Sequence, residues 1–286
     1  MTYEMKPLLE ERMKLLLSGE EDFNAFSKII HTHPRSFIRC NTIKMESDVL
    51  FARLSKKWNV NRPFANVPEI MIVESDLGPG ELGNSIEHVL GYYYIQEISS
   101  MMSCLALDPQ PGDKVLDVCA SPGSKTTQIA ARMQNKGTLI ANDLKLDRVA
   151  ILSANTERCG VTNAVVTRMD GVGLCTRFYD NGIKFDKILL DAPCSGEGTL
   201  RSSPKTFLMW NPKMIDKFSR MQCKLIAHAL KCLNVGGTLV YSTCTHAPEE
   251  NEMIAQYLLD NFNIEILEIN LPLKTRPGIS EWNGVK

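Results

Sequence analysis

From Gly112 onward the chain alternates between short apolar runs and amphipathic stretches, and this alternation restricts its possible folds more than any other feature. The runs KVLDVCA, GTLIAND, AVVTRMD, FDKILLDAPC, GTLVYSTCT and IEILEI predict six strands. Helical patterns stand between most of these strands. They include LDRVAILSANTERCG, which ends at a glycine, and a long one from about Pro212 to Cys232. Strands alternating with helices favour a mainly parallel sheet covered on both faces.

The first 92 residues have a different pattern and predict a small α+β domain. Helices are expected over residues 3–17 and 20–31, a strand in SFIRCNTI, a helix in SDVLFARLSKKW, and a further strand from Asn66 to Glu74. YYYIQEISSMMSCLALDP then predicts a helix that leads into the larger unit. We therefore expect two domains, over residues 1–92 and 93–286.

Composition narrows the class of protein. No apolar run approaches the ~18 residues that a membrane span needs, and the acidic start MTYEMKPLLEERMK lacks the apolar centre of a signal peptide. Nine cysteines without a CxxC pair argue against a disulfide framework and a structural zinc site, and five histidines form no ligand cluster. We expect a cytoplasmic, monomeric protein that uses neither a membrane nor a metal.

Charge is unevenly distributed although the net charge is only −1. The stretch Lys28–Arg62 carries eight Lys and Arg residues against two acids, and Leu200–Lys224 carries six against one. Two basic stretches in a neutral protein could form one face for a polyanion or two solvated helix faces, and charge counting leaves both open.

Between the first strand of the larger unit and its helix lies the turn DVCASPGSKTT. A turn at a helix N-terminus offers unpaired backbone N–H groups and the positive end of the helix dipole. It is not a dinucleotide fingerprint, because Gly123 is its only glycine, and not a P-loop, because Ser124 stands where a glycine must precede Lys125. The turn suits a ligand that approaches closely but has no phosphates.

Acids end the next three predicted strands: Asp143, Asp170 and Asp191. Any one such acid is more often a helix cap or a turn former. An acid after the second strand, however, is well placed to hold ribose hydroxyls in a nucleotide-binding sheet. Three acids at successive strand ends suit a ligand with a ribose, an adenine amine and a positive centre, and so predict S-adenosylmethionine.

Two cysteines lie just past buried strands, Cys194 in DAPCSGEG and Cys244 in YSTCT. A thiolate that adds at carbon 6 of a pyrimidine makes carbon 5 electron-rich enough to accept a methyl group. Asp191 is positioned to stabilise the adduct near N3, and a second thiol or a neighbouring base could assist the loss of the carbon-5 proton. Taken singly, a cysteine is most often a buried small hydrophobe, and this remains the prediction for Cys40, Cys104, Cys159, Cys175, Cys223 and Cys232.

These motifs resemble those of the NSUN-type family of RNA (cytosine-5)-methyltransferases. The resemblance rests on DVCASPGSKTTQ, Asp143, Asp170, DAPCSGEGT, and YSTCT followed by PEENE, with RSFIRCNTIK and GYYYIQEISSMM upstream. It implies a Rossmann-like, S-adenosylmethionine-dependent methyltransferase sheet with a small RRM-like N-terminal domain. It also implies a compact, archaeal-type enzyme without a C-terminal RNA-binding module, which forms 5-methylcytosine in tRNA or, as an alternative, in rRNA.

The resemblance also implies a role for each site residue. The nucleophile is Cys244 of the Thr-Cys motif, Cys194 of the Pro-Cys motif takes part in product release, and Asp191 orients the base. Family members usually close with a basic, aromatic last strand, and none is legible before the chain stops at EWNGVK. The cofactor contacts that the resemblance implies are Cys119, Ala120, Ser121, Pro122, Gly123, Ser124, Lys125, Asp143, Arg148, Asp170 and Asp191.

Other hypotheses stay open at this point. A DNA cytosine methyltransferase would use Cys194 as its nucleophile and leave Cys244 without a role. A non-catalytic RNA-binding or assembly factor would need neither the two cysteines nor the cofactor turn. A nicotinamide oxidoreductase is poorly supported, because the glycine fingerprint is missing.

Overall fold

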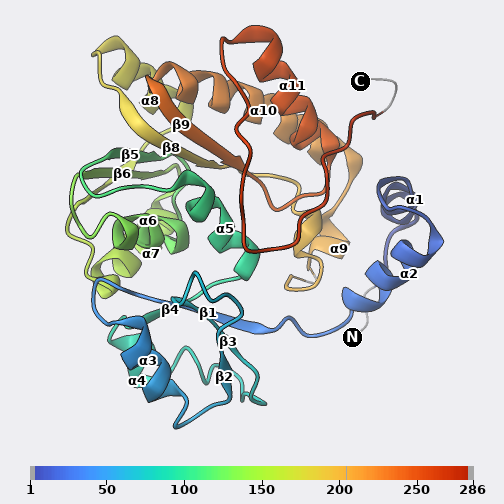
Figure 1. The fold of residues 1–286 in the computed structure, drawn as a ribbon. Coiled ribbons are helices and arrows are strands. Elements are labelled where there is room, and N and C mark those ends of the chain that lie inside the picture. Colours follow the sequence, from blue (N-terminus) through green and yellow to red (C-terminus); the bar gives the residue numbers. More distant parts are fainter. Residues whose placement is uncertain (1–3, 204, 283–286) are drawn as a thin grey trace.

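The computed structural model describes residues 4–203 and 205–282, which form a larger parallel sheet, a smaller antiparallel sheet and a pair of N-terminal helices (Figure 1). The larger sheet has the strand order β7-β6-β5-β8-β9, and its neighbouring strands are all parallel. This confirms the predicted parallel α/β architecture. Its strands are β5 (Lys114–Asp117), β6 (Thr138–Asp143), β7 (Ala164–Arg168), β8 (Phe185–Asp191) and β9 (Leu233–Ser242).

The order of this sheet reverses between β5 and β8, which are neighbours although two strands separate them in the chain. In open α/β sheets, ligands bind outside the carboxyl ends of the strands at such a switch point. The candidate site is therefore expected where β5 and β8 end. The connecting helices are α6 (Ser124–Arg132), α7 (Leu146–Cys159), α8 (Gly171–Asp180), α9 (Lys205–Met209), α10 (Pro212–Lys231) and α11 (Glu252–Asn261), and α5 (Ile98–Leu107) precedes β5.

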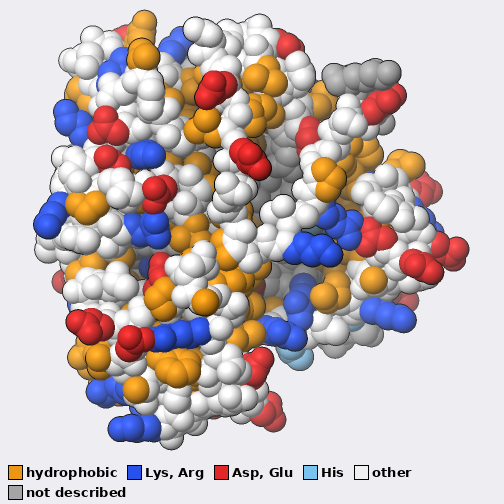
Figure 2. Space-filling model, in the orientation of Figure 1, with side chains coloured by type: hydrophobic (Ala, Val, Ile, Leu, Met, Phe, Trp, Pro, Cys, Tyr) orange, Lys and Arg blue, Asp and Glu red, His pale blue; other side chains and the backbone are white. Residues whose placement is uncertain are grey.

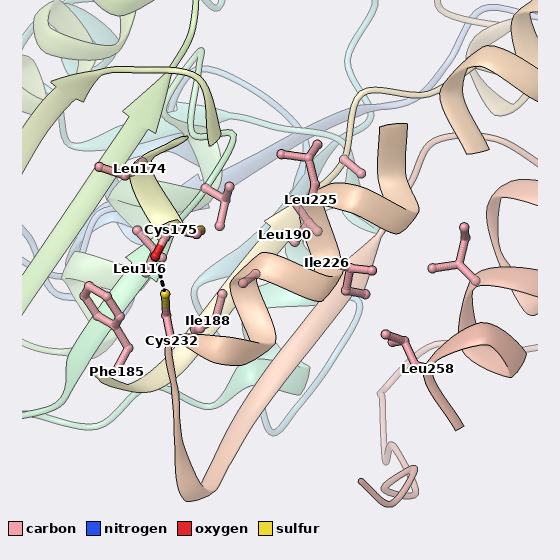
Figure 3. Close-up of a cluster of buried hydrophobic side chains, with 14 residues drawn as sticks. Leu116, Leu174, Cys175, Phe185, Ile188, Leu190, Leu225, Ile226, Cys232 and Leu258 are labelled. Carbon is pink, nitrogen blue, oxygen red and sulfur yellow. Dashed lines mark hydrogen bonds between the residues drawn. The ribbon is translucent and has the colours of Figure 1, made fainter. Parts of the chain in front are cut away.

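Consecutive residues of the central strands point to opposite faces of the larger sheet, and each face has its own layer of helices. Leu116, Ile188 and Leu190 are buried in a cluster with side chains of α8, α10 and α11 (Figure 3). Val115 and Leu189 point the other way, into a cluster with α5 and α6. Strands buried on both faces explain the continuous apolar runs that the sequence shows here.

The smaller sheet lies below the larger one in Figure 1 and has the strand order β2-β3-β1-β4, with all neighbours antiparallel. Ile38 and Met71 on one face pack with Leu50 of α3, while Ile70 on the other face packs with Met101 of α5. The sheet is thus covered on one side by its own helix and on the other by the larger unit. Its elements are β1 (Ser36–Cys40), α3 (Ser47–Leu54), β2 (Val60–Asn61), β3 (Ile70–Val73), α4 (Ile86–Val89) and β4 (Tyr93–Ile95).

The two N-terminal helices, α1 (Pro7–Leu16) and α2 (Glu20–Ile29), lie apart from the smaller sheet, at the right of Figure 1. Leu9 of α1 is buried in a cluster with Trp210 and Ala247, which belong to the segments that follow β8 and β9. The sequence predicted both helices, although residue 3 of the first prediction lies outside the described residues. The helices pack against the loops of the larger unit.

The division expected after residue 92 does not follow this packing. β4 begins at Tyr93 and pairs with β1, with Tyr93 opposite Cys40, so the division separates β4 from its own sheet. The helix predicted over YYYIQEISSMMSCLALDP was wrong at its start, because Tyr93–Ile95 form β4 and the helix begins only at Ile98. The division also groups α1 and α2 with the smaller sheet rather than with the loops on which they pack.

The larger unit differs from the sequence predictions in two further ways. Helix α8 was not predicted, because its glycine-rich start obscures the helical period. The strand predicted in IEILEI is absent: among the described residues the sheet ends at β9, and residues 264–269 pair with no strand. Ile266 and Ile269 are exposed there, and without a neighbouring strand to pair with, an isoleucine-rich segment does not form a strand. Every helix in the described part of the chain is too short or too polar to cross a membrane.

Gly91 brings the smaller sheet against α7. It adopts φ +73°, and a Cβ built there would lie 2.0 Å from the Arg158 carbonyl oxygen. We expect Gly91→Ala to lower the free energy of unfolding by about 3 kcal/mol, because backbone strain and overpacking add. The matched control is Gly112→Ala, since Gly112 has φ +102° with no atom near its Cβ position, and there only the strain of about 1–2 kcal/mol remains. Equal losses in denaturant titrations of the two variants would contradict this account.

Candidate active site

The carboxyl ends of β8 and β9 form the centre of the site. Their pairing places Asp191 opposite Ser242, and the Ser242 hydroxyl donates to Asp191 Oδ1 over 2.8 Å. On its other side, Asp191 Oδ2 accepts a hydrogen bond of 2.6 Å from Lys125 Nζ, which comes from the first turn of α6. The end of β8 is thereby held both to its neighbouring strand and to the predicted cofactor turn.

Cys194 and Cys244 meet just beyond these strand ends. Their Sγ atoms are 3.2 Å apart, and Cys244 is exposed while Cys194 is partly buried. The hydrogen bond between the thiols raises the pKa of Cys194, which burial raises further, and lowers the pKa of Cys244. The Cys244 backbone N–H donates to Cys194 Sγ over 3.3 Å, an opposing and smaller effect. Cys244 is therefore the thiol of the pair that ionises first.

Lys125 binds Asp191, and its charge also affects the pKa of Cys244. Burial by itself lowers the pKa of Lys125, but the charge and the hydrogen bond of Asp191 outweigh burial and raise it above its ordinary value. The ammonium charge in turn favours the Cys244 thiolate and partly offsets the opposite effect of Asp191 on that thiol. The site thus holds a cation, a carboxylate and a thiol of lowered pKa near the carboxyl ends of neighbouring strands.

Two residues shape the predicted cofactor turn: Gly123, which has a left-handed backbone conformation, and Asp143, which ends β6. Gly123 begins α6 with φ +103°, and a Cβ there would lie 3.1 Å from the Leu152 side chain, so a larger residue is disfavoured. Asp143, at the end of β6, accepts from the Ser121 backbone N–H over 3.3 Å and from Arg148 Nε over 3.1 Å. Arg148 also donates to the Ser121 carbonyl over 2.7 Å. Asp143 and Arg148 therefore hold the turn in place.

The other predicted turn residues lie on the same loop with differing exposure. Ala120 and Ser121 are buried, Pro122 is exposed, and Ser124 is partly buried at the start of α6. Cys119 is partly buried, and burial raises its pKa, so its thiol stays protonated. This agrees with a role for its backbone rather than its sulfur.

Asp170 has a structural partner within its own segment. Its Oδ2 accepts from the Gly173 backbone N–H over 2.9 Å and so caps the N-terminus of α8. The carboxylate is exposed at the end of β7, beside the ends of β6 and β5 in the strand order. Asp170 therefore caps α8 and also lies at the carboxyl end of the sheet, where the cofactor site was predicted.

Asp117 is a further candidate site residue, which the sequence predictions did not name. It ends β5, directly before the cofactor turn, and burial raises its pKa to about 7 although a hydrogen bond from Thr126 acts in the opposite direction. Within the described residues its Oδ1 is buried and has no hydrogen-bond partner. A buried, unpartnered oxygen under a helix N-terminus, with Asp143, Asp170 and Asp191 at the neighbouring strand ends, fits a ligand with hydroxyl and amine donors. Its position as the last residue of the first strand was the available signal.

Two buried carboxylates beneath the cysteine loops were also missed. Glu250 accepts from the Ser195 backbone N–H and from Gln222 Nε2, and burial raises its pKa. Glu197 accepts from Trp210 Nε1 and Thr245 Oγ1. The motifs DAPCSGEG and PEENE that drew attention to the cysteines contain both acids, but an acid in a motif carries no signal of burial. In the described part of the chain no group of three His, Cys, Asp or Glu side chains could hold a metal ion.

A sequence profile of the family 16S rRNA methyltransferase RsmB/F matches residues 104–281. The chain belongs to this family. It is 40% identical over 282 residues to the tRNA (cytosine(49)-C(5))-methyltransferase of Pyrococcus abyssi, covering 98% of this chain and 87% of that protein. It is also 40% identical over 256 residues to the Ribosomal RNA small subunit methyltransferase F of Vibrio parahaemolyticus, covering 88% of this chain and 52% of that protein. The chain thus spans about half the length of this bacterial relative.

Solved structures of two Pyrococcus horikoshii proteins share the fold over nearly the whole chain. The structure of NSun6 with SFG has a TM-score of 0.84 at 26% identity and covers 96% of this chain and 91% of that one. A methyltransferase homolog has a TM-score of 0.77 at 32% identity and covers 95% of this chain and 87% of that one. The Rossmann-like methyltransferase fold of the RsmB/F family is therefore present, and the resemblance seen in the sequence motifs is confirmed.

The thiol contact makes a prediction about pH. Because the Cys194 thiol donates to the Cys244 thiolate, Cys194→Ala should raise the pKa of Cys244 and shift its alkylation by iodoacetamide to higher pH. Cys194→Ser keeps a donor and should shift the profile much less. Alkylation of Cys244 would be followed by tandem mass spectrometry of tryptic peptides. Fragment ions are needed because the buried Cys232 lies in the same peptide as Cys244, whereas the buried Cys175 lies in another. An unchanged profile in Cys194→Ala would rule out this origin of the lowered pKa.

Proposed function

We propose that this protein uses S-adenosylmethionine to methylate carbon 5 of cytosine in RNA, and that its substrate is tRNA. The observation that carries the proposal is the contact of Cys194 with Cys244 beside the Lys125–Asp191 pair. Family membership supports methyl transfer to RNA, and the Pyrococcus abyssi relative, a tRNA cytosine-5 enzyme, matches 87% of its length. Bacterial relatives that act on ribosomal RNA make rRNA the second candidate.

We assign the attack to Cys244. Its lowered pKa supports this role, because the thiolate is the nucleophile that adds to carbon 6 of cytosine. Formation of the Sγ–C6 bond moves electron density to carbon 5 and charge towards N3. In this proposal Asp191 would face N3 of the base, and Lys125, whose Nζ lies 2.6 Å from the Asp191 carboxylate, would supply the proton. The raised pKa of Cys194 disfavours a DNA-type mechanism in which Cys194 is the nucleophile.

Cys194 acts after methyl transfer in this proposal. Carbon 5 must lose its proton before the C6–Sγ bond can break and return the electron pair to Cys244. Cys194, in contact with Cys244, is placed to take part in this elimination. A protein without Cys194 can therefore form the bond to RNA but releases it slowly.

The cofactor is assigned to the region between the turn and the three strand ends. S-adenosylmethionine, when bound, supplies an electrophilic methyl group. The turn from Cys119 to Lys125 would surround it, Asp143 with Arg148 would hold its ribose, and Asp170 and Asp191 would contact the rest. The unpartnered oxygen of Asp117 supports a donor-rich ligand here, and the NSun6 neighbour was solved with SFG, an analogue of S-adenosylmethionine.

We propose that the smaller sheet has the topology of an RRM but does not bind RNA by stacking bases on its face. The order β1-α3-β2-β3-α4-β4 with sheet order β2-β3-β1-β4 supports the topology. An RRM stacks bases on the open face of its sheet. Here Arg39, Ile70 and Tyr94 are buried on that face, and Arg39 bonds to Thr127 and Gln128 of α6. We therefore propose contacts to phosphate and RNA shape rather than stacking on this sheet.

Of the two basic stretches, the second is the better candidate for phosphate contacts. In the first, Arg39 is buried, and Arg53 and Lys57 bind the buried Glu87. Figure 2 shows Lys and Arg side chains beside a hollow next to the N-terminal helices. In the second stretch, exposed cations recur along one side of α10. Cations at this spacing share one helix face. They are Lys213, Lys217, Arg220 and Lys224.

The proposal is tested with the two cysteine variants and mixed tRNA and rRNA. Cys244→Ala should abolish methylation, because no adduct can form. Cys194→Ala should accumulate a covalent protein–RNA complex that survives denaturing electrophoresis, because elimination is slowed. Bisulfite sequencing of both RNA classes after incubation with the wild type should place the new 5-methylcytosine in tRNA. Full activity of Cys244→Ala would contradict the mechanism, and modification confined to rRNA would contradict the substrate.

A further inference from the structure

Glu197 lies three residues after Cys194 and, like Glu250, is a fully buried carboxylate near the two cysteines. Its side chain is fully buried, on the short 3-10 turn Glu197–Thr199. Trp210 Nε1 donates to its Oε1 over 2.9 Å, and Arg12 Nε of α1 donates to the same oxygen over 3.2 Å. Burying a carboxylate is costly unless it is paired and hydrogen-bonded, and Arg12 supplies the pairing charge.

The other oxygen of Glu197 reaches the loop that carries the second cysteine. Thr245 Oγ1 donates to Glu197 Oε2 over 3.2 Å, and Thr245 directly follows Cys244. The Thr245 hydroxyl is also 2.7 Å from that of Ser195, the residue after Cys194. One carboxylate on the Cys194 loop thus binds the neighbour of Cys244.

Gly198 closes the same contact through the backbone. Its N–H donates to the Cys244 carbonyl over 2.9 Å, and a Cβ at this position would lie only 3.0 Å from that oxygen. The two loops are therefore in close contact at backbone and side chain alike. The separation of the cysteine sulfur atoms depends on this contact rather than on the strands alone, which end before either cysteine.

We propose that Glu197 is a positioning residue that holds Cys244 at contact distance from Cys194. Neutralised by Arg12, its carboxylate fixes Thr245 and so the Cys244 loop against the Cys194 loop. The inference rests on the proposed function for its catalytic consequence, since elimination needs both cysteines at once. Loosening the loops should therefore slow product release more than it weakens cofactor binding.

The test compares Glu197→Ala with the conservative Glu197→Gln and with Thr245→Val. Glu197→Ala and Thr245→Val should lower kcat at least about tenfold, leave KM for S-adenosylmethionine within about twofold, and increase the covalent RNA complex present during turnover. Glu197→Gln should restore most of kcat, because its amide can still accept from Trp210 and donate to Thr245. The matched control is Glu249→Ala, which removes the second carboxylate that Arg12 contacts but none that Thr245 contacts. It should retain kcat within about threefold.

A second measurement does not depend on RNA. If Glu197 maintains the thiol contact, the alkylation profile of Cys244 should shift to higher pH in Glu197→Ala and stay in place in Glu249→Ala. Wild-type kcat and an unshifted profile in Glu197→Ala would overturn the proposal, as would an equal loss of kcat in Glu249→Ala. A shifted profile in a protein whose wild type shows no RNA methylation would support the positioning role and reject the proposed function instead.

Discussion

The parallel pairing of β8 with β9 determines where each reacting side chain can lie. Because the register sets Asp191 opposite Ser242, two chain segments leave the sheet side by side, with Cys194 and Cys244 only a few residues further on. A register shift of one residue would turn Asp191 away from Ser242 and separate the two loops. The apolar side chains that bury both strands from two faces maintain this register and thereby support the chemistry at its end.

Beyond the strand ends, ion pairs and hydrogen bonds, rather than apolar packing, hold the site residues in place. Lys125 neutralises Asp191, and the buried acids Glu197 and Glu250 organise the cysteine loops from below. Arg12 extends this arrangement to α1, so a helix near the start of the chain contacts the machinery near its end. The N-terminal helices therefore belong to the support of the site, and their sequence distance from it conceals this role.

The sequence predicted the parallel sheet and the position of Cys194 and Cys244 just after buried strands, because both depend on local patterns. Apolar runs buried on two faces are legible without tertiary information, and so is a cysteine just past such a run. The residues of β4 were assigned to a predicted helix, because a three-residue strand is too short to show an alternating pattern. Residues 264–269 are rich in isoleucine and so favour a strand, but a strand needs a neighbour that no sequence pattern supplies. Asp117 and Glu197 were missed since burial and long-range partners such as Arg12 are properties of the fold.

The most direct test of the central claim is to identify the cysteine that bonds to RNA. RNA containing 5-azacytosine would be incubated with the protein and cofactor, and the trapped complex digested with trypsin and nuclease for mass spectrometry. Cys194 falls in the tryptic peptide of residues 188–201 and Cys244 in that of residues 232–274, so the two sites are distinguished by mass. The account predicts a nucleotide bound to Cys244 in the second peptide. A nucleotide on Cys194 would contradict it.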